Sequence, residues 1–336
     1  MNDVIASGDW LPYSFAFLMG LSMIIYAILD GYDLGVGMLS RFAEDKEKDR
    51  MIASIGPFWD ANETWLVLGV GLLLVAFPAA HGIILTNLYL PVAVMLIGLI
   101  FRGVAFDFRS KAKFEYKEKW NTAFFAGSFV ASSAQGYMLG AYILGFQTGV
   151  AAFLFSMLIG FCVAAGYCLI GACWLIMKCE DELQVKAVRW AQLSLYATLI
   201  GIVLVSISTP IMSPRIFEKW FSFPEIFMLA PIPVMTAVLA FGLMYTLRLL
   251  PTPNDNFSWL PFVMTIGIYI LCFHGLAYSF FPYIVPEKMT IVEAASAPES
   301  LIIILVGALI VLPFLIGYTF LAYWIFHGKA QDLSYD

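Results

Sequence analysis

The feature that most constrains this chain is a series of long, nearly uncharged apolar segments. A transmembrane helix needs about 20 predominantly apolar residues, and nine segments reach that length. They run approximately over Leu11–Leu39, Ile52–Phe77, Ile83–Phe106, Asn121–Gly145, Val150–Met177, Ala187–Thr209, Glu225–Leu249, Leu260–Tyr283 and Ser300–Phe326. The loops between them are short, so the sequence predicts one integral membrane domain, residues 1–336, that is all-α and polytopic.

The composition supports lipid as the main solvent. Only 12% of the residues are charged and 61% are hydrophobic, whereas soluble domains carry about 25% charged residues. The basic residues form no patch with interleaved aromatic residues, which argues against a nucleic-acid partner. Four of the five cysteines (Cys162, Cys168, Cys173 and Cys179) fall in one apolar stretch without a CxxC pair. This pattern favours buried thiols over a metal site.

Basic residues are distributed very unequally between the predicted loops. Alternate loops and the C-terminus hold fourteen, and the loops of the opposite side hold three, Arg215, Lys219 and Lys288. The fourteen are Arg41, Lys46, Lys48, Arg50, Arg109, Lys111, Lys113, Lys117, Lys119, Lys178, Lys186, Arg189, Arg248 and Lys329. Because short cytoplasmic loops are enriched in Lys and Arg, the sequence predicts an N-terminus outside and a C-terminus in the cytoplasm.

Five ionisable side chains fall inside the first three predicted helices. Asp30 and Asp33 are three residues apart and share one face of the first helix, and Asp60 and Glu63 have the same spacing on the second. Arg102 follows an almost wholly apolar run in the third. A charge at mid-membrane costs about 2.5–3.5 kcal/mol on the insertion scale, so such residues are functional by default.

The predicted topology brings these charges together in the cytoplasmic half of the membrane. One arginine cannot neutralise four carboxylates, so some of the acids should be protonated or hydrated. A track of protonatable groups is what proton conduction requires. The alternative is that Asp60 and Glu63, shortly after Pro57, lie at a helix start, where the helix dipole favours acids.

His274 is the histidine nearest the middle of a predicted helix. A haem requires axial ligands such as His or Met, and no recognisable second ligand accompanies His274. The sequence therefore favours a packing or hydrogen-bonding role for His274, and it assigns no cofactor and no metal to this chain.

Four segments resemble the subunit II family of cytochrome bd oxidases. They are DGYDLGVG from Asp30, IGPFWDANETW from Ile55, LYLPVAVMLIGLIFRGVAFDFRSK from Leu88 and GLAYSFFPYIVP from Gly275. Their order, their spacing and the closing segment from Leu312 extend the resemblance over the whole chain. Two departures are Tyr32, where the family commonly has Phe, and Ala61, where it commonly has Gly.

The resemblance implies one subunit of a heterodimeric quinol oxidase of aerobic respiration, which reduces dioxygen to water in a bacterial or archaeal plasma (inner) membrane. Subunit I would carry haems b558, b595 and d and the quinol site. Subunit II would have nine helices, as two four-helix bundles plus one peripheral helix. A small single-helix accessory subunit and a bound quinone are compatible with the family, and the short chain suggests its cyanide-insensitive branch.

In this family the aspartate of the Trp-Asp motif belongs to a water-filled proton path from the cytoplasm near the subunit interface. That role would fall on Asp60, beside Trp59. The residues expected to support the path are Glu63, Asp30, Asp33 and Arg102. A proton-coupled secondary transporter is the alternative from another class, although transporters place such charges at the midplane of paired repeats. A purely structural partner is the third reading.

The loop asymmetry predicts the outcome of a topology assay. A reporter that is active only outside the cytoplasm should be silent when fused after Asp336, and active when inserted between Phe217 and Phe221. The opposite pattern would overturn the predicted orientation.

Overall fold

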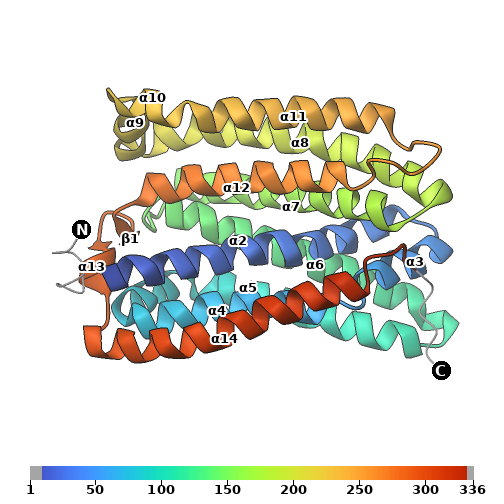
Figure 1. Cartoon of the computed structure of the whole chain (residues 1–336), viewed down its shortest axis with the longest axis horizontal. Coiled ribbons are helices and arrows are strands. Elements are labelled where there is room, and N and C mark those ends of the chain that lie inside the picture. Colours follow the sequence, from blue (N-terminus) through green and yellow to red (C-terminus); the bar gives the residue numbers. More distant parts are fainter. Residues whose placement is uncertain (1–9, 331–336) are drawn as a thin grey trace.

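The computed structural model describes residues 10–330, which fold almost entirely into helices (Figure 1). The long helices are α2 (Trp10–Leu39), α4 (Trp59–Ala76), α5 (Pro78–Lys111), α6 (Phe114–Ile143), α7 (Val150–Lys178), α8 (Asp181–Met212), α11 (Pro231–Leu249), α12 (Leu260–Phe280) and α14 (Pro298–Ile325). The short ones are η1 (Ser40–Phe42), α3 (Asp45–Ile55), α9 (Pro214–Phe221), α10 (Glu225–Leu229) and α13 (Ile291–Ala294). Strands β1 (Tyr283–Val285) and β2 (Met289–Thr290) form an antiparallel hairpin with Tyr283 opposite Thr290.

The described helices are long and apolar enough for a polytopic membrane protein. Seven candidate spans are present, and the bent pair α3–α4 would be an eighth. Helix α6 is as long as the spans, with 30 residues, but it begins with a charged turn and carries several serines and a glutamine in its middle. The all-α polytopic class predicted from the sequence is therefore confirmed.

The second predicted helix differs from the structure at its start. The sequence predicts one continuous helix from Ile52, whereas α3 ends at Ile55 and α4 begins at Trp59, with a bend of 51° between them. Gly56 and Pro57 occupy the break. Glycine is a poor helix former, and proline removes a helical hydrogen bond and clashes with the preceding turn, so the two residues together end α3.

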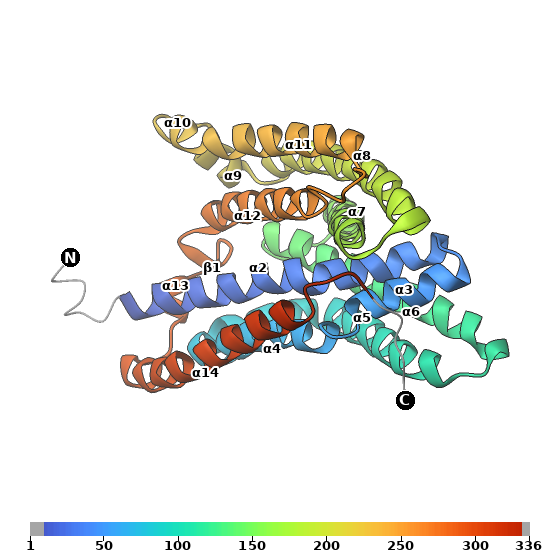
Figure 2. The same ribbon diagram turned by 45° about the vertical axis from the view of Figure 1, so that its right-hand side comes forward.

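The long helices form two groups that meet along α7 (Figures 1 and 2). Helices α2, α4, α5 and α6 pack together, as do α7, α8, α11 and α12, while α7 also packs against α2 and α6. Helix α14 lies outside both groups and contacts α2 and α4. The second part of α2 is thus surrounded by protein, and every residue from Asp30 to Leu39 is buried.

Small residues allow α2 and α7 to approach closely. A Cβ atom at Gly35 would lie 1.8 Å from the carbonyl oxygen of Tyr167, and one at Gly171 would lie 2.7 Å from the backbone of Gly35. Only glycine fits at these two positions, in keeping with the small residues found where membrane helices meet. This contact fixes the depth and rotation of the α2 segment that carries Asp30 and Asp33.

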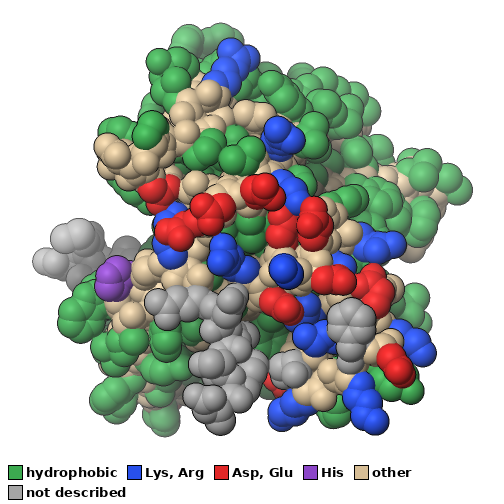
Figure 3. Space-filling view, turned by 90° about the vertical axis from the view of Figure 1, so that its right-hand side faces the viewer, with side chains coloured by type: hydrophobic (Ala, Val, Ile, Leu, Met, Phe, Trp, Pro, Cys, Tyr) green, Lys and Arg blue, Asp and Glu red, His purple; other side chains and the backbone are tan. Residues whose placement is uncertain are grey.

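Charged side chains gather at one end of the molecule, which we call the basic end (Figure 3). It comprises η1, α3, the α5–α6 and α7–α8 turns and the 250–259 loop. Acids and bases alternate on this face, and the ion pairs include Lys186–Glu47 at 2.7 Å and Lys48–Glu118 at 3.2 Å. Such an end is suited to water rather than to lipid.

The segment after α14 is fastened to the basic end. The Lys178 ammonium donates hydrogen bonds to the carbonyls of Phe326 and Gly328, and Lys329 pairs with Asp255 at 2.5 Å. Burial acts to raise the pKa of the Asp255 carboxyl, but hydrogen bonds from Lys329 and Gln184 outweigh it and hold this pKa below its ordinary value. The end of the peripheral helix is therefore anchored by charge, although most of its length is exposed.

Candidate functional site

The centre of the site is the buried guanidinium of Arg102 on α5. Its Nη1 lies 2.5 Å from Asp30 Oδ1 and 3.0 Å from Glu63 Oε1, and its Nη2 lies 3.8 Å from Asp33 Oδ2. The side chains of Asp30 and Asp33 are fully buried, and that of Glu63 is 28% exposed. We call Arg102, Asp30, Asp33 and Glu63 the charge cluster.

The charge cluster cannot be electrically neutral with every acid ionised. Arginine stays protonated in proteins, so three carboxylates around one guanidinium would leave two uncompensated negative charges in a buried site. Uncompensated buried charge is strongly destabilising. At least one of the three acids must therefore hold a proton or be stabilised by water.

Four buried polar atoms of the cluster have no hydrogen-bond partner among the described residues. They are Asp30 Oδ2, Asp33 Oδ1 and the Nε and Nη2 atoms of Arg102. Buried polar groups of this kind are normally satisfied by ordered water. The geometry of the cluster thus fits a hydrated site.

Trp59 and Asp60 occupy the first turn of α4, beside the cluster but not within it. The guanidinium of Arg102 lies 5.8 Å from the centre of the Trp59 ring, in cation–π contact. Asp60 is exposed on the outer face of α4, and no ion pair among the described residues includes it. The sequence expectation that four acids face Arg102 therefore holds for three of them in the structure, while Asp60 lies at the surface.

A second set of polar side chains extends from Asp33. The Asn62 amide nitrogen donates to Asp33 Oδ2 at 2.8 Å and to the Tyr32 hydroxyl at 2.9 Å. The Tyr323 hydroxyl of α14 donates to Asn62 Oδ1 at 3.2 Å and lies 2.6 Å from the Tyr32 hydroxyl. The cluster is thus linked to the last helix of the chain.

A third set of polar side chains lies one helical turn before Asp30 on α2. The Gln135 amide nitrogen donates to the Tyr26 hydroxyl at 2.7 Å, and the Tyr167 hydroxyl donates to the Gln135 oxygen at 2.8 Å. Tyr26 precedes Asp30 by four residues and therefore lies on the same face of α2. Helices α2, α6 and α7 are joined here by polar contacts inside an apolar bundle.

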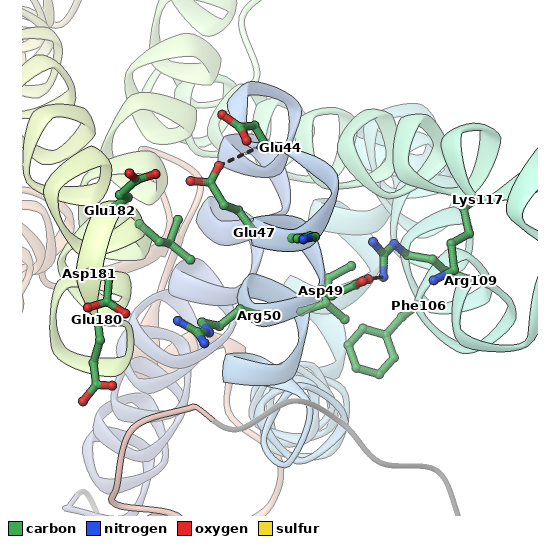
Figure 4. A pocket seen from close by; sticks show the side chains of 13 residues that line it. Glu44, Glu47, Asp49, Arg50, Phe106, Arg109, Lys117, Glu180, Asp181 and Glu182 are labelled. Atoms are coloured by element: carbon green, nitrogen blue, oxygen red, sulfur yellow. Dashed lines mark hydrogen bonds and ion pairs between the residues drawn. The ribbon is translucent and has the colours of Figure 1, made fainter.

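A cavity of about 720 Å³ opens at the basic end (Figure 4). Charged side chains of α3, α5, α6, the α7–α8 turn and the first turn of α8 line it, including Glu47, Arg50 and Asp181. Its wall contains the Arg109–Asp49 ion pair at 2.6 Å. Phe106 also lines the cavity, and its ring lies 4.9 Å from that of Trp59. One aromatic pair therefore separates a polar cavity from the charge cluster.

His274 lies on the exposed surface of α12, away from the cluster. Its Nδ1 is hydrogen-bonded to the Ile270 carbonyl of its own helix at 2.7 Å. The hydrogen-bonding role predicted from the sequence fits this geometry, whereas packing in the bundle interior does not. Within residues 10–330, no group of three or more His, Cys, Asp and Glu side chains could hold a metal ion.

Sequence reasoning did not find Asn62, Tyr32 and Tyr323 as members of the site. Asn62 could have been predicted from the sequence, because a polar amide next to Glu63 on an apolar helix also needs hydrogen-bond partners inside the bundle. Tyr323 carried none, since it lies 261 residues from Asn62 in the chain.

The helical bundle and its buried charges define a polytopic membrane subunit with protonatable groups at the meeting point of three helices. The family model for cytochrome bd terminal oxidase subunit II matches residues 11–326. The chain belongs to the cytochrome bd terminal oxidase subunit II family, which confirms the resemblance found in the sequence.

Individual relatives match over nearly the whole chain. "Cytochrome bd-I ubiquinol oxidase subunit 2" of Escherichia coli (strain K12) is 28% identical over 368 residues, covering 95% of each chain. "Cytochrome bd ubiquinol oxidase subunit 2" of Bacillus subtilis (strain 168) is 27% identical over 334 residues, covering 94% of this chain and 95% of the relative. The solved structure of bd oxidase from Geobacillus thermodenitrificans superposes with a TM-score of 0.78 at 17% identity, covering 94% of this chain and 98% of the other. The structural match shows that the fold is shared.

Replacing Arg102 by Leu should damage assembly before it affects turnover. Removing one partner of a buried ion pair costs about 3–5 kcal/mol, because the other charges remain buried and unpaired. The yield and thermal stability of the purified complex measure this loss.

Arg41→Leu is the matched control, because Arg41 is 54% exposed and its pair with Glu118 is long, at 3.6 Å. Exposed pairs contribute about 0–1 kcal/mol, so this variant should assemble normally. Adding Asp30→Asn to Arg102→Leu should recover part of the yield by removing one unpaired charge. If Arg102→Leu assembles like the parent complex, the acids do not need a cation.

Proposed function

We propose that this chain is subunit II of a bacterial membrane quinol:oxygen oxidoreductase, and that it conducts protons from the cytoplasm toward the haem-bearing subunit I. The observation that carries the proposal is the charge cluster, in which three acids share one guanidinium next to the exposed carboxylate of Asp60. The matched relatives named above are bacterial oxidase subunits, and the match over residues 11–326 favours this class over the transporter alternative.

We propose that the chain crosses the membrane nine times. The spans are the seven apolar helices, the bent pair α3–α4 and the more polar α6, which packs between α5 and α7. With fourteen basic residues on one side and three on the other, the basic end faces the cytoplasm and the N-terminus lies outside. The charge cluster then lies in the cytoplasmic half of the bundle.

The exposed face of α4 is the proposed contact with subunit I. Asp60 and Glu63 open onto the same surface as the apolar side chains of Val67 and Leu74, which are 72% and 49% exposed. Acids facing lipid would cost several kcal/mol, whereas a partner with polar groups or water at this face would remove that cost. Subunit I, as the expected partner, supplies such a face.

The proposed route starts in the cavity at the basic end. Water in this cavity reaches the Phe106–Trp59 pair, beyond which lie Arg102 and Glu63. Glu63 connects the buried cluster with the surface on this route, because its carboxylate pairs with Arg102 on one side and is partly exposed on the other. Asp60, one turn earlier on α4, then takes the proton at the subunit surface.

The redox chemistry belongs to subunit I in this proposal. Haems b558, b595 and d would take electrons from quinol and reduce dioxygen there, and this chain would bind no haem. A bound quinone, a small single-helix accessory subunit and membership of the cyanide-insensitive branch remain predictions from the family resemblance.

Asp60→Asn should leave the complex assembled while slowing quinol oxidation with oxygen. Asparagine keeps the size and hydrogen bonding of aspartate but cannot carry a proton, and a positioned proton-transfer group typically contributes roughly 10²-fold or more in rate. Asp60→Glu should retain more of the rate. Oxygen consumption normalised to haem content is the measurement.

The competing interpretation treats Asp60 as a helix-start acid worth roughly 0.3–1 kcal/mol. Glu115→Gln is the matched control, because Glu115 lies in the first turn of α6 and outside the cluster. The control should keep the parental rate. Equal rates for Asp60→Asn and Glu115→Gln would mean that Asp60 carries no proton and acts only as a helix-start acid.

His274→Ala should leave every haem absorption band of the complex unchanged. His274 Nδ1 is engaged by its own helix, and α12 presents no second His within the described residues. An optical spectrum of the purified variant is the test. A lost band in a fully assembled complex would make this chain a haem protein.

A further inference from the structure

Helix α14 lies at the edge of the bundle, yet it contacts the site through one side chain. Leu301 is the only buried residue of α14 in the described structure, and the helix is apolar and exposed along most of its length. At its basic end Tyr323 turns inward and stacks on Phe58 with ring centres 4.5 Å apart. The Tyr323 hydroxyl then reaches Asn62 and Tyr32.

The Asn62 amide has a defined orientation because of these partners. Its nitrogen donates to Asp33, to Tyr32 and to the Leu29 carbonyl at 3.3 Å, and its oxygen accepts from Tyr323. An amide oxygen can only accept and an amide nitrogen can only donate. The Leu29 carbonyl, which can only accept, therefore keeps the nitrogen on the α2 side, and the Tyr323 hydroxyl supplies the hydrogen bond to the oxygen on the α14 side.

We propose that Tyr323 is a positioning residue for the charge cluster, which holds the Asn62 amide so that its nitrogen faces Asp33. The proposal rests on the proton path proposed above, since it concerns an acid of the charge cluster that supports that path. Tyr32 stands where the family commonly has Phe. Its hydroxyl lies 2.6 Å from the Tyr323 hydroxyl, and this hydrogen bond helps to hold Tyr323 in place.

The orientation of Asn62 matters for the proton on Asp33. A donated hydrogen bond stabilises the carboxylate form, so an amide nitrogen that moves away from Asp33 would favour the protonated form. The other charged groups that face Asp33 are Asp30 on its own helix, Glu63 on α4 and Arg102 on α5. Without the Tyr323 hydroxyl, the Asn62 oxygen has no donor among the described contacts, and the amide is held from the α2 side alone.

The test is a titration of Asp33 in the purified complex with subunit I. Infrared difference spectra recorded against pH contain the band of the protonated Asp33 carboxyl, which is assigned by its absence in Asp33→Asn. In Tyr323→Phe, the band should persist to higher pH than in the parent complex, because the Asn62 amide that donates to Asp33 loses the partner of its oxygen. The phenyl ring keeps the stacking on Phe58, so the complex should assemble.

Tyr318→Phe is the matched control, because Tyr318 lies on the same helix and is 56% exposed. Its titration should equal that of the parent complex. Asn62→Ala removes the donor itself and should shift the band in the same direction by at least as much. An unshifted band in both Tyr323→Phe and Asn62→Ala would overturn the proposal, as would an equal shift in Tyr318→Phe.

The infrared readout separates this inference from the proposed function. If Asp60→Asn keeps the parental rate while the band still shifts in Tyr323→Phe, the proton path fails and the positioning role stands. If the path holds, Tyr323→Phe should also slow oxygen consumption several-fold, and this effect should vanish in the Asp33→Asn background. A rate effect that persists unchanged in that background would show that Tyr323 does not act through Asp33.

Discussion

The structure depends on one buried cation that cannot be discharged. Arginine keeps its proton in proteins, so a guanidinium inside an apolar bundle must be met by acids, amides or water from neighbouring helices. Arg102 meets this requirement with Asp30 and Asp33 of α2 and Glu63 of α4. Helices α2, α4 and α5 therefore have little freedom to rotate or to slide past one another, and the tight α2–α7 contact at Gly35 fixes the remaining neighbour.

The break between α3 and α4 explains how one site can be both buried and accessible. Because α4 begins only at Trp59, Asp60 and Glu63 lie in its first two turns, next to Trp59, whose ring packs against Phe106 of the cavity lining. The same turns present one side to Arg102 and the other to the surface. A continuous helix from Ile52 would have rotated these residues differently with respect to Arg102, so Gly56 and Pro57 are part of the site's construction.

Much of this arrangement could be predicted from the sequence, because apolar length and loop charge act locally along the chain. The all-α class and the meeting of Asp30, Asp33, Glu63 and Arg102 follow from helix periodicity and short connections. The contact of Tyr323 with Asn62 could not be predicted, since it joins residues 261 positions apart through the docking of a peripheral helix. The exposure of Asp60 was also hidden, because the rotation of α4 about its axis is set by tertiary packing and by the break at Pro57.

The separation of Asp60 from Arg102 suits the two groups to different tasks in the proposed path. An acid in a short ion pair with a guanidinium is fixed in place by that contact. Asp30, at 2.5 Å from Arg102, is such a group and serves to keep the cation in place. Asp60 has no such pair among residues 10–330 and lies exposed on α4, where it can meet water or a partner subunit. Glu63, paired with Arg102 on one side and partly exposed on the other, links the buried cluster to Asp60 at the surface of α4.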